Sequence, residues 1–191
     1  MSRDQRCLHV GTASSVPARS IAGRAIFFIS VTILLSGVTT ARAVEIGARA
    51  PAFELPALGS DAHVSLDQLK GKVVFVDFWA SWCGPCRQSL PQYEKLRTEL
   101  AQEEFAILAI NLDEEAADAT AFLKQHPVNY TILRDPAGEV PKAFGLVGMP
   151  TSYLIDRDGI VRATHTGFTP EDIDKLRGEI HGLLGKHEDA K

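Results

Sequence analysis

The sequence is poor in cysteine, with three in 191 residues, which excludes the small secreted scaffolds that several disulfides hold together. It also lacks internal repeats, low-complexity tracts and any linker long enough to separate two domains. With 45% hydrophobic and 23% charged residues, the composition argues against a disordered or collagen-like chain. These absences leave one well-packed globular domain as the expected organisation.

Long apolar runs are missing as well. The longest apolar stretch, residues 25–38, has 14 residues, whereas a membrane-spanning helix needs roughly 20. Arginines precede this stretch and small residues follow it up to Ala43, an arrangement typical of a secretory signal that is cleaved there. We therefore expect a signal peptide at 1–43 and localisation of the folded domain in the periplasm. The alternative is an uncleaved membrane anchor, if the apolar stretch extends from Ile21 to Ala43.

Basic residues are in the minority over the expected domain, 44–191, where 15 Lys and Arg stand against 23 Asp and Glu, a formal charge of −8. Nucleic acid is not an expected partner, because binding it requires clustered Lys and Arg to neutralise phosphates. This range excludes Cys7 and keeps only Cys83 and Cys86. Two cysteines spaced CxxC form one short disulfide or half of a zinc site. Zinc is the weaker alternative, since no second cysteine pair or suitably spaced histidines are present, so we expect no metal.

The hydrophobic pattern predicts a mixed α/β domain. Residues 73–79 form a nearly continuous apolar run, typical of a strand buried on both faces, and Asp77 is its one misfit. From Cys86 to Leu100 the apolar residues recur at helical spacing, and Pro91 should kink this helix. Strands that alternate with helices predict a mixed sheet covered on both sides. The remaining expected elements are an N-terminal hairpin (a strand within 47–55 and one at 63–65), strands at 105–110, 130–133, 151–155 and 160–166, and helices at 115–125, 140–144 and 169–183.

The cysteine pair lies at the expected start of a helix. A thiol attacks as its thiolate, and the free N–H groups and dipole of a helix start stabilise negative charge. Cys83 occupies this position, whereas Cys86 lies one turn further in and points toward the core. We expect Cys83 to attack a disulfide of another protein and Cys86 to resolve the mixed disulfide. A structural disulfide is the alternative.

The residues around the cysteines resemble a known family. Residues 76–86, VDFWASWCGPC, resemble the active-site segment of thioredoxin, and Pro91 matches its helix-kinking proline. The resemblance implies a thioredoxin fold, with a central mixed β-sheet flanked by helices, an N-terminal hairpin and an inserted βα unit. Similarity to the TlpA/ResA branch of periplasmic thioredoxin-like proteins is carried by residues 50–53, 105–125 and 148–159.

The same resemblance implies roles for residues beside the cysteines. Asp77 would accept the proton of Cys86, and burial in the strand should raise its pKa. An ion pair of Asp77 with Lys72 or Lys95 is the alternative. The remaining roles concern substrate binding, through a cis-proline at Pro150, the outward backbone of Met149 and an apolar platform at Trp82.

One position departs from the TlpA/ResA pattern. Many ResA-like proteins carry Glu three residues after the second cysteine, where this chain has Ser89, and often Asn in place of Asp77. The acid therefore lies on the strand, and a specific role in cytochrome c maturation is not expected. His126 and His165 are interpreted as residues without chemistry.

The expected function is an exported thiol–disulfide oxidoreductase that reduces disulfides of exported proteins. Its redox centre is the Cys83–Cys86 disulfide, with no other cofactor. The resemblance implies a membrane thiol transporter of the DsbD/CcdA type as electron donor, and a monomer is expected. The alternatives are a non-enzymatic module that binds client proteins or copper, and a thiol peroxidase.

Overall fold

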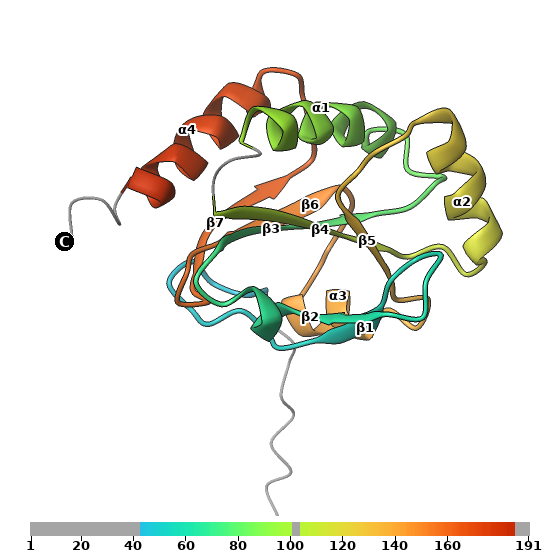
Figure 1. The fold of residues 1–191 in the computed structure, drawn as a ribbon, viewed down its shortest axis with the longest axis horizontal. Coiled ribbons are helices and arrows are strands. Elements are labelled where there is room, and N and C mark those ends of the chain that lie inside the picture. The colour runs from blue at the N-terminus through green and yellow to red at the C-terminus, as the bar shows by residue number, and fades with distance from the viewer. Residues whose placement is uncertain (1–42, 101–103, 186–191) are drawn as a thin grey trace, which may run out of the picture. The chain divides into compact units, whose positions relative to one another are not determined.

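The computed structural model describes residues 43–100 and 104–185, so the predicted signal segment, 1–43, lies outside it except for Ala43. The described residues form a five-stranded sheet in the order β5-β4-β3-β6-β7 and a two-stranded hairpin (Figure 1). The hairpin consists of β1 (Glu54–Pro56) and β2 (His63–Ser65). The sheet strands are β3 (Val73–Trp79), β4 (Phe105–Asn111), β5 (Thr131–Arg134), β6 (Thr151–Ile155) and β7 (Val161–Thr166).

The directions of the strands and the positions of the helices are those of a thioredoxin fold. Strands β3, β4 and β5 are parallel, whereas β6 runs antiparallel to β3 and β7 antiparallel to β6. This arrangement confirms the predicted mixed sheet, the N-terminal hairpin and the inserted unit of β4 and α2. The helices are α1 (Cys86–Glu99), α2 (Ala116–Gln125), α3 (Glu139–Phe144) and α4 (Asp172–Gly185), with a short 3-10 helix η1 at Leu66–Leu69.

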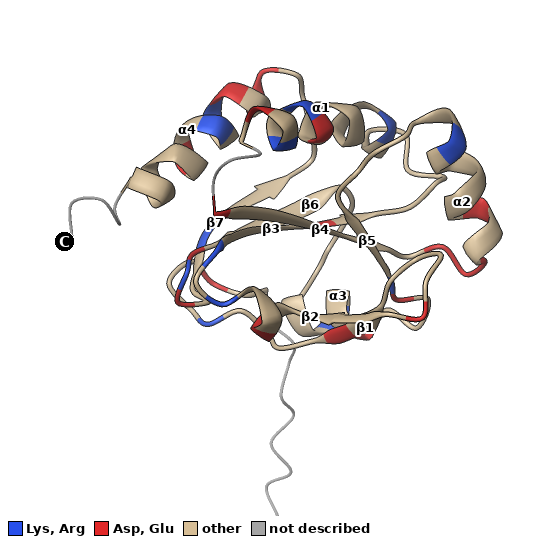
Figure 2. Cartoon of the chain, in the orientation of Figure 1, with Lys and Arg blue, Asp and Glu red and all other residues tan. Residues whose placement is uncertain are grey.

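Strand β3 lies at the centre of the sheet and contributes to two apolar cores. Phe75 and Trp79 pack with side chains of α1, α2 and α4, whereas Val76 and Phe78 pack with α3 and the hairpin. In Figure 1 α1 and α4 accordingly cover one face, and α3 and the hairpin the other. Successive side chains of a strand point to opposite faces, so Asp77 is on the side of α1 and α4. Charged residues lie mainly on helices and loops around these cores (Figure 2).

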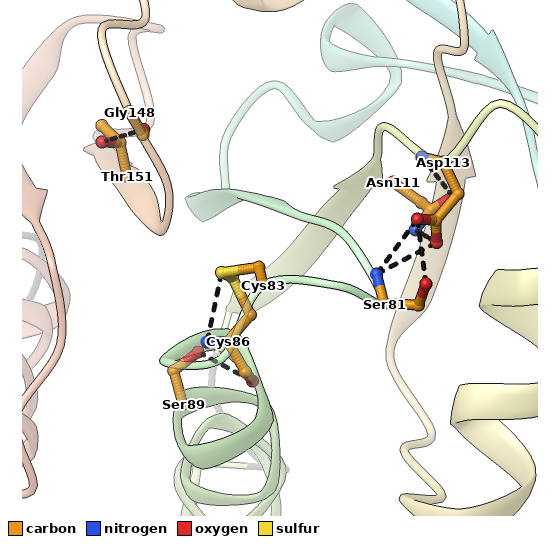
Figure 3. Close-up of a disulfide and its surroundings, with 8 residues drawn as sticks. All are labelled: Ser81, Cys83, Cys86, Ser89, Asn111, Asp113, Gly148 and Thr151. Carbon is orange, nitrogen blue, oxygen red and sulfur yellow. Dashed lines mark hydrogen bonds between the residues drawn. A yellow bond between two sulfur atoms is a disulfide. The ribbon is translucent and has the colours of Figure 1, made fainter.

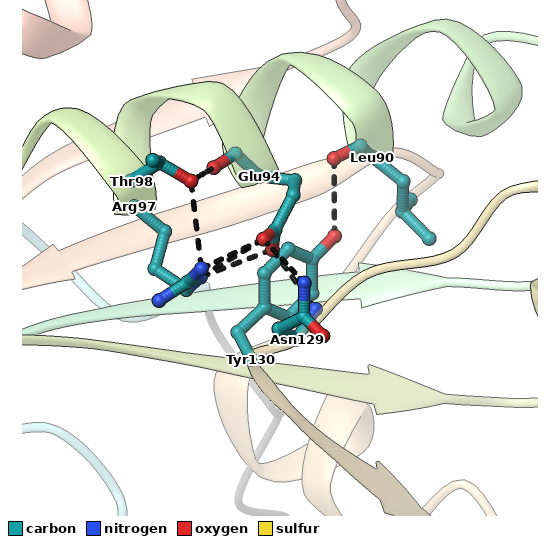
Figure 4. Close-up of polar contacts among 6 residues, drawn as sticks. All are labelled: Leu90, Glu94, Arg97, Thr98, Asn129 and Tyr130. Carbon is teal, nitrogen blue, oxygen red and sulfur yellow. Dashed lines mark hydrogen bonds and ion pairs between the residues drawn. The ribbon is translucent and has the colours of Figure 1, made fainter. Parts of the chain in front are cut away.

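A polar network holds α1 against the segment that leads into β5 (Figure 4). The carboxylate of Glu94 accepts hydrogen bonds from Arg97 (2.8 Å) and from the backbone and side-chain N–H groups of Asn129 (2.9 Å each). Next to it, the Tyr130 hydroxyl donates to the carbonyl of Leu90 at 3.2 Å. Burial acts to raise the pKa of Glu94, but the hydrogen bonds from Arg97 and Asn129 lower it to about 2.

The observed elements differ from the predicted ones mainly at their ends. Ile160 lies outside β7, which begins at Val161; it forms an isolated antiparallel bridge with Arg49, and its N–H donates to Asp156 Oδ1 at 2.9 Å. The last helix begins at Asp172, whose carboxylate accepts the backbone N–H of Thr169 at 2.6 Å. The helix η1 was not predicted, although the Gln68 side chain accepts the N–H of Ser65 as in a capping box.

Candidate active site

Cys83 and Cys86 form a disulfide at the start of α1, with their Cα atoms 5.3 Å apart (Figure 3). The regular helix begins at Cys86, so Cys83 precedes it by three residues. The N–H of Cys86 points at the sulfur of Cys83, at 3.3 Å. This donor stabilises negative charge on Cys83 when the disulfide is open. Cys83 is 5% exposed and Cys86 is fully buried, which matches the predicted outer and inner positions.

A hydrogen-bonded cluster at the ends of β3 and β4 holds the segment before the disulfide (Figure 3). The Asp113 carboxylate accepts the backbone N–H of Ser81 at 3.1 Å and its hydroxyl at 3.0 Å. It also accepts a hydrogen bond from Asn111 Nδ2 at 2.8 Å, and it is 2% exposed. Sequence reasoning missed this cluster. Its one signal was two polar residues, Asn111 and Asp113, directly after an apolar strand run, where parallel strand ends meet.

Asp77 is fully buried in the middle of β3. Neither of its carboxylate oxygens has a hydrogen-bond partner among the described residues, and no ion pair to Lys72 or Lys95 is found there. Burial raises the pKa of Asp77 well above its usual range, as expected from the sequence. An unpartnered carboxyl of this kind is suited to holding a proton, because its neutral form is favoured in an apolar site.

Two tyrosine hydroxyls lie close enough to Asp77 to respond to its charge. Burial, followed by the charge of Asp77, raises the pKa of both Tyr93 and Tyr130 well above its usual range. Tyr93 is 3% exposed and belongs to the same apolar core as both cysteines. Asp77 and the disulfide are therefore both on the α1 side of the sheet.

The loop before β6 contains a cis peptide bond between Met149 and Pro150, which confirms the predicted cis-proline. The Thr151 hydroxyl donates to the Gly148 carbonyl at 2.8 Å, and the Pro150 carbonyl accepts the N–H of Gly167 at 2.8 Å. Met149 packs against the core that contains Cys83 and Cys86. The structure thus brings this loop to the cysteines, while its role in substrate binding stays a prediction.

Comparisons with known proteins agree with this geometry. Residues 45–180 match the Redoxin family. The chain is 32% identical over 148 residues to the thiol-disulfide oxidoreductase ResA of Bacillus cereus, an alignment that covers 72% of this chain and 85% of that protein. The chain belongs to the Redoxin family, as a TlpA/ResA-like thioredoxin protein. ResA and its relatives are named thiol-disulfide oxidoreductases, so this chain is an enzyme of that class.

Solved structures of the thioredoxin family have the same fold. A chain from Chlorobium tepidum assigned as the thiol:disulfide interchange protein DsbE is 43% identical, with a TM-score of 0.71, and the match covers 74% of this oxidoreductase and 99% of that chain. A Bacteroides thetaiotaomicron structure assigned as a protein disulfide isomerase is 32% identical, with a TM-score of 0.69 and coverage of 78% and 96%. Within residues 43–100 and 104–185, no helix of the oxidoreductase is long and apolar enough to span a membrane.

The surface beside the disulfide carries an open groove of about 320 Å³. Its walls come from the active-site segment, with Trp82 and Arg87, and from α2, with Phe122 and His126. Trp82 is 67% exposed, an unusual exposure for so large an apolar side chain. The inserted helix of the oxidoreductase thus forms one wall of a groove next to Cys83.

Ser89, the position that departs from the ResA-like pattern, is fully buried in α1. Its hydroxyl donates to the Cys86 carbonyl at 3.3 Å. The inner cysteine of the oxidoreductase therefore has a helix-bound hydroxyl nearby where many relatives would have a carboxyl. Among the described residues, Asp77 is the buried acid on this side of the sheet without hydrogen-bond partners.

Proposed function

We propose that this oxidoreductase reduces disulfides of exported proteins. The observation that carries the proposal is the disulfide at the start of α1, with the outer Cys83 sulfur facing a helix N–H and the unpartnered carboxyl of Asp77 buried on the same side of the sheet. In the reduced enzyme, the Cys83 thiolate attacks one sulfur of a client disulfide, and the other client sulfur leaves as a thiolate. Asp77 takes the proton of the Cys86 thiol. The Cys86 sulfur then attacks Cys83, which releases the second client thiolate and leaves the enzyme oxidised.

Client binding is assigned to the surface around Cys83. Trp82 offers an exposed apolar face, and the groove it shares with α2 accommodates a client side chain. Pro150 would turn the backbone of Met149 outward to pair with an extended client segment, since main-chain hydrogen bonds recognise peptides of any sequence.

The proposed direction of electron flow is based on the two residues between the cysteines and on the buried Asp77 of β3. Gly84, Pro85 and Asp77 resemble thioredoxin, whose potential is near −270 mV, against about −120 mV for the oxidant DsbA. A reductase in an oxidising compartment needs a donor, for which we propose a membrane thiol transporter of the DsbD/CcdA type. The periplasm and cleavage after Ala43 are part of this proposal, and N-terminal sequencing of the exported protein should begin at Val44.

Insulin reduction tests the proposal directly. With dithiothreitol as electron source, the enzyme should accelerate precipitation of the insulin B chain, and the Cys83→Ala variant should not. A client-binding or copper-handling module would leave insulin intact. The potential of the Cys83–Cys86 pair, measured by equilibration with glutathione, should lie nearer that of thioredoxin, and a value above about −180 mV would reverse the direction.

A further inference from the structure

A row of side chains crosses the sheet from Asp77 toward the surface. Asp77 of β3 is the register partner of Ser152 on β6, and Ser152 is the register partner of His165 on β7. Register partners point to the same face, so all three side chains are on the side of α1 and α4. Ser152 is 2% exposed and is the hydroxyl that β6 contributes to this face; all five residues of the strand are buried.

The outer end of the row is a contact between a histidine and a carboxylate. His165 Nε2 lies 2.8 Å from Glu179 Oε2 on α4, and the two side chains are 13% and 28% exposed. The other carboxylate oxygen of Glu179, Oε1, lies 3.9 Å from Lys175 Nζ. The row therefore ends at an imidazole that contacts a partly exposed carboxylate.

A small cavity, lined mainly by apolar surface with a few polar groups, lies between the row and the helices. Its walls include Tyr93 of α1, Ser152, His165 and Asp172 of α4, and its volume is about 10 Å³, close to what one water molecule needs. Tyr93 and Ser152 thus line one cavity with His165, next to Asp77, whose charge acts on the Tyr93 hydroxyl.

The geometry points to a proton path that connects Asp77 with solvent through Ser152, Tyr93 and the cavity beside them to His165 and Glu179. This inference rests on the proposed role of Asp77 as proton acceptor. In the oxidised structure neither carboxylate oxygen of Asp77 has a hydrogen-bond partner among the described residues, so transfer requires the neighbouring Asp77 and Ser152 side chains to approach each other. The proton that Asp77 took from Cys86 then passes to the Ser152 hydroxyl as that hydroxyl gives up its own proton toward His165. His165 then releases one proton to Glu179 or water. Each hydroxyl ends as it began, so one proton moves outward and no electrons move.

Among the described residues, Ala109, Tyr130 and Ser89 offer Asp77 no equivalent route. Its register partner on the opposite side is Ala109 of β4, which has no polar side chain. The Tyr130 hydroxyl donates a hydrogen bond to the Leu90 carbonyl, and the Ser89 hydroxyl donates one to the Cys86 carbonyl. The groups facing His165 are Ser152, Tyr93, Asp172 and Glu179, with Lys175 on the far side of Glu179.

A pH jump on the oxidised full chain tests the path. The protonated carboxyl of Asp77 has a C=O stretching band in the infrared, which Asp77→Asn identifies by removing it. After a jump to higher pH, this band should decay at least about tenfold more slowly in Ser152→Ala and in His165→Gln. A positioned proton-transfer group contributes ~100-fold or more, so a tenfold effect is a modest threshold. Thr164→Ala, the exposed neighbour of His165 on the opposite face, should keep the original rate.

The outcomes separate this inference from the proposed function. Unchanged decay in both variants, with a band that still belongs to Asp77, would overturn the path and leave Asp77 as the acceptor. A band or a mixed-disulfide resolution rate that Asp77→Asn leaves unaltered would remove the acceptor itself. Ser152→Thr, which keeps a hydroxyl, should restore fast decay, and slow decay in that variant as well would show that packing, not the hydroxyl, sets the rate.

Discussion

At the scale of single residues, the distinguishing feature of Asp77 is a buried carboxyl without hydrogen-bond partners among the described residues. A buried carboxyl normally has hydrogen-bond donors or a cation beside it, because an isolated charge in an apolar site is costly. Asp77 has neither among the described residues, and its pKa is raised by burial. The neutral form is thus favoured whenever the pH allows it, which is the property that a proton acceptor for Cys86 requires.

The stability of an Asp77→Asn variant should reveal this property through its pH dependence. Below about pH 4, Asp77 is protonated in both the folded and unfolded states, so its ionisation affects neither protein. As the pH rises toward the raised native pKa, ionisation favours the unfolded state of the wild type only. Urea denaturation of the oxidised proteins should therefore show an advantage for Asp77→Asn that grows with pH.

The same substitution should slow resolution of the mixed disulfide at neutral pH and leave formation of that disulfide unchanged. A stability advantage independent of pH would mean that the pKa of Asp77 is the same in the folded and unfolded states. Resolution at the wild-type rate would make Asp77 a structural residue.

At the scale of elements, two polar clusters fix the segments that carry the cysteines. Asp113 ties the end of β4 to Ser81 before Cys83, and Glu94 ties α1 to Asn129 before β5. Both join segments more than 30 residues apart in the chain. The disulfide thus lies between a fixed loop and a fixed helix.

Asp113→Ala should loosen the loop before Cys83. Removing the carboxylate leaves the Ser81 N–H and the Asn111 side chain without their acceptor, at a cost of roughly 1–3 kcal/mol for each buried group left unpaired. We expect a lower urea midpoint and a lower kcat/KM for insulin. Glu114→Ala, at the neighbouring exposed position, is the control and should change neither. Wild-type activity in Asp113→Ala would show that the cluster does not position Cys83.

Glu94→Gln should destabilise the protein by about 2 kcal/mol at neutral pH, because a charged acceptor for Arg97 and Asn129 is lost. The folded pKa of about 2 lies below the unfolded value, so this contribution is complete above about pH 4.3 and disappears as the pH falls toward 2. Chemical denaturation across this range measures it. Glu99→Gln, which removes a half-exposed partner of Arg177, should cost less than about 1 kcal/mol. An effect of Glu94→Gln that persists at pH 2 would exclude the electrostatic explanation.

These elements also show what the sequence predicts and what it does not. Strand β3 was predicted with its observed ends, because an uninterrupted apolar run marks a strand buried on both faces, and the cis bond before Pro150 followed from the family resemblance. The link from Asp113 to Ser81 spans 32 residues and exists because the ends of β3 and β4 are neighbours. From the sequence, His165 was interpreted as a residue without chemistry. Its place in a row with Asp77 and Ser152 depends on the strand register, which the sequence does not show.

At the scale of the whole molecule, the fold gives the two cysteines unequal environments. The five-stranded sheet and α1 bury Cys86 completely, whereas Cys83 retains 5% of its surface beside the groove of Trp82. This difference favours reaction of a client disulfide at the sulfur of Cys83. The central prediction is that Cys83 attacks the client and Cys86 resolves the mixed disulfide.

Trapping with the Cys86→Ala variant in the exporting host tests this claim most directly. Without the resolving thiol, mixed disulfides between Cys83 and client proteins should accumulate and separate on a non-reducing gel. The same adducts should disappear with dithiothreitol and be missing from a Cys83→Ala, Cys86→Ala double variant. Stable adducts in Cys83→Ala, formed through Cys86, or no adducts in Cys86→Ala, would contradict it.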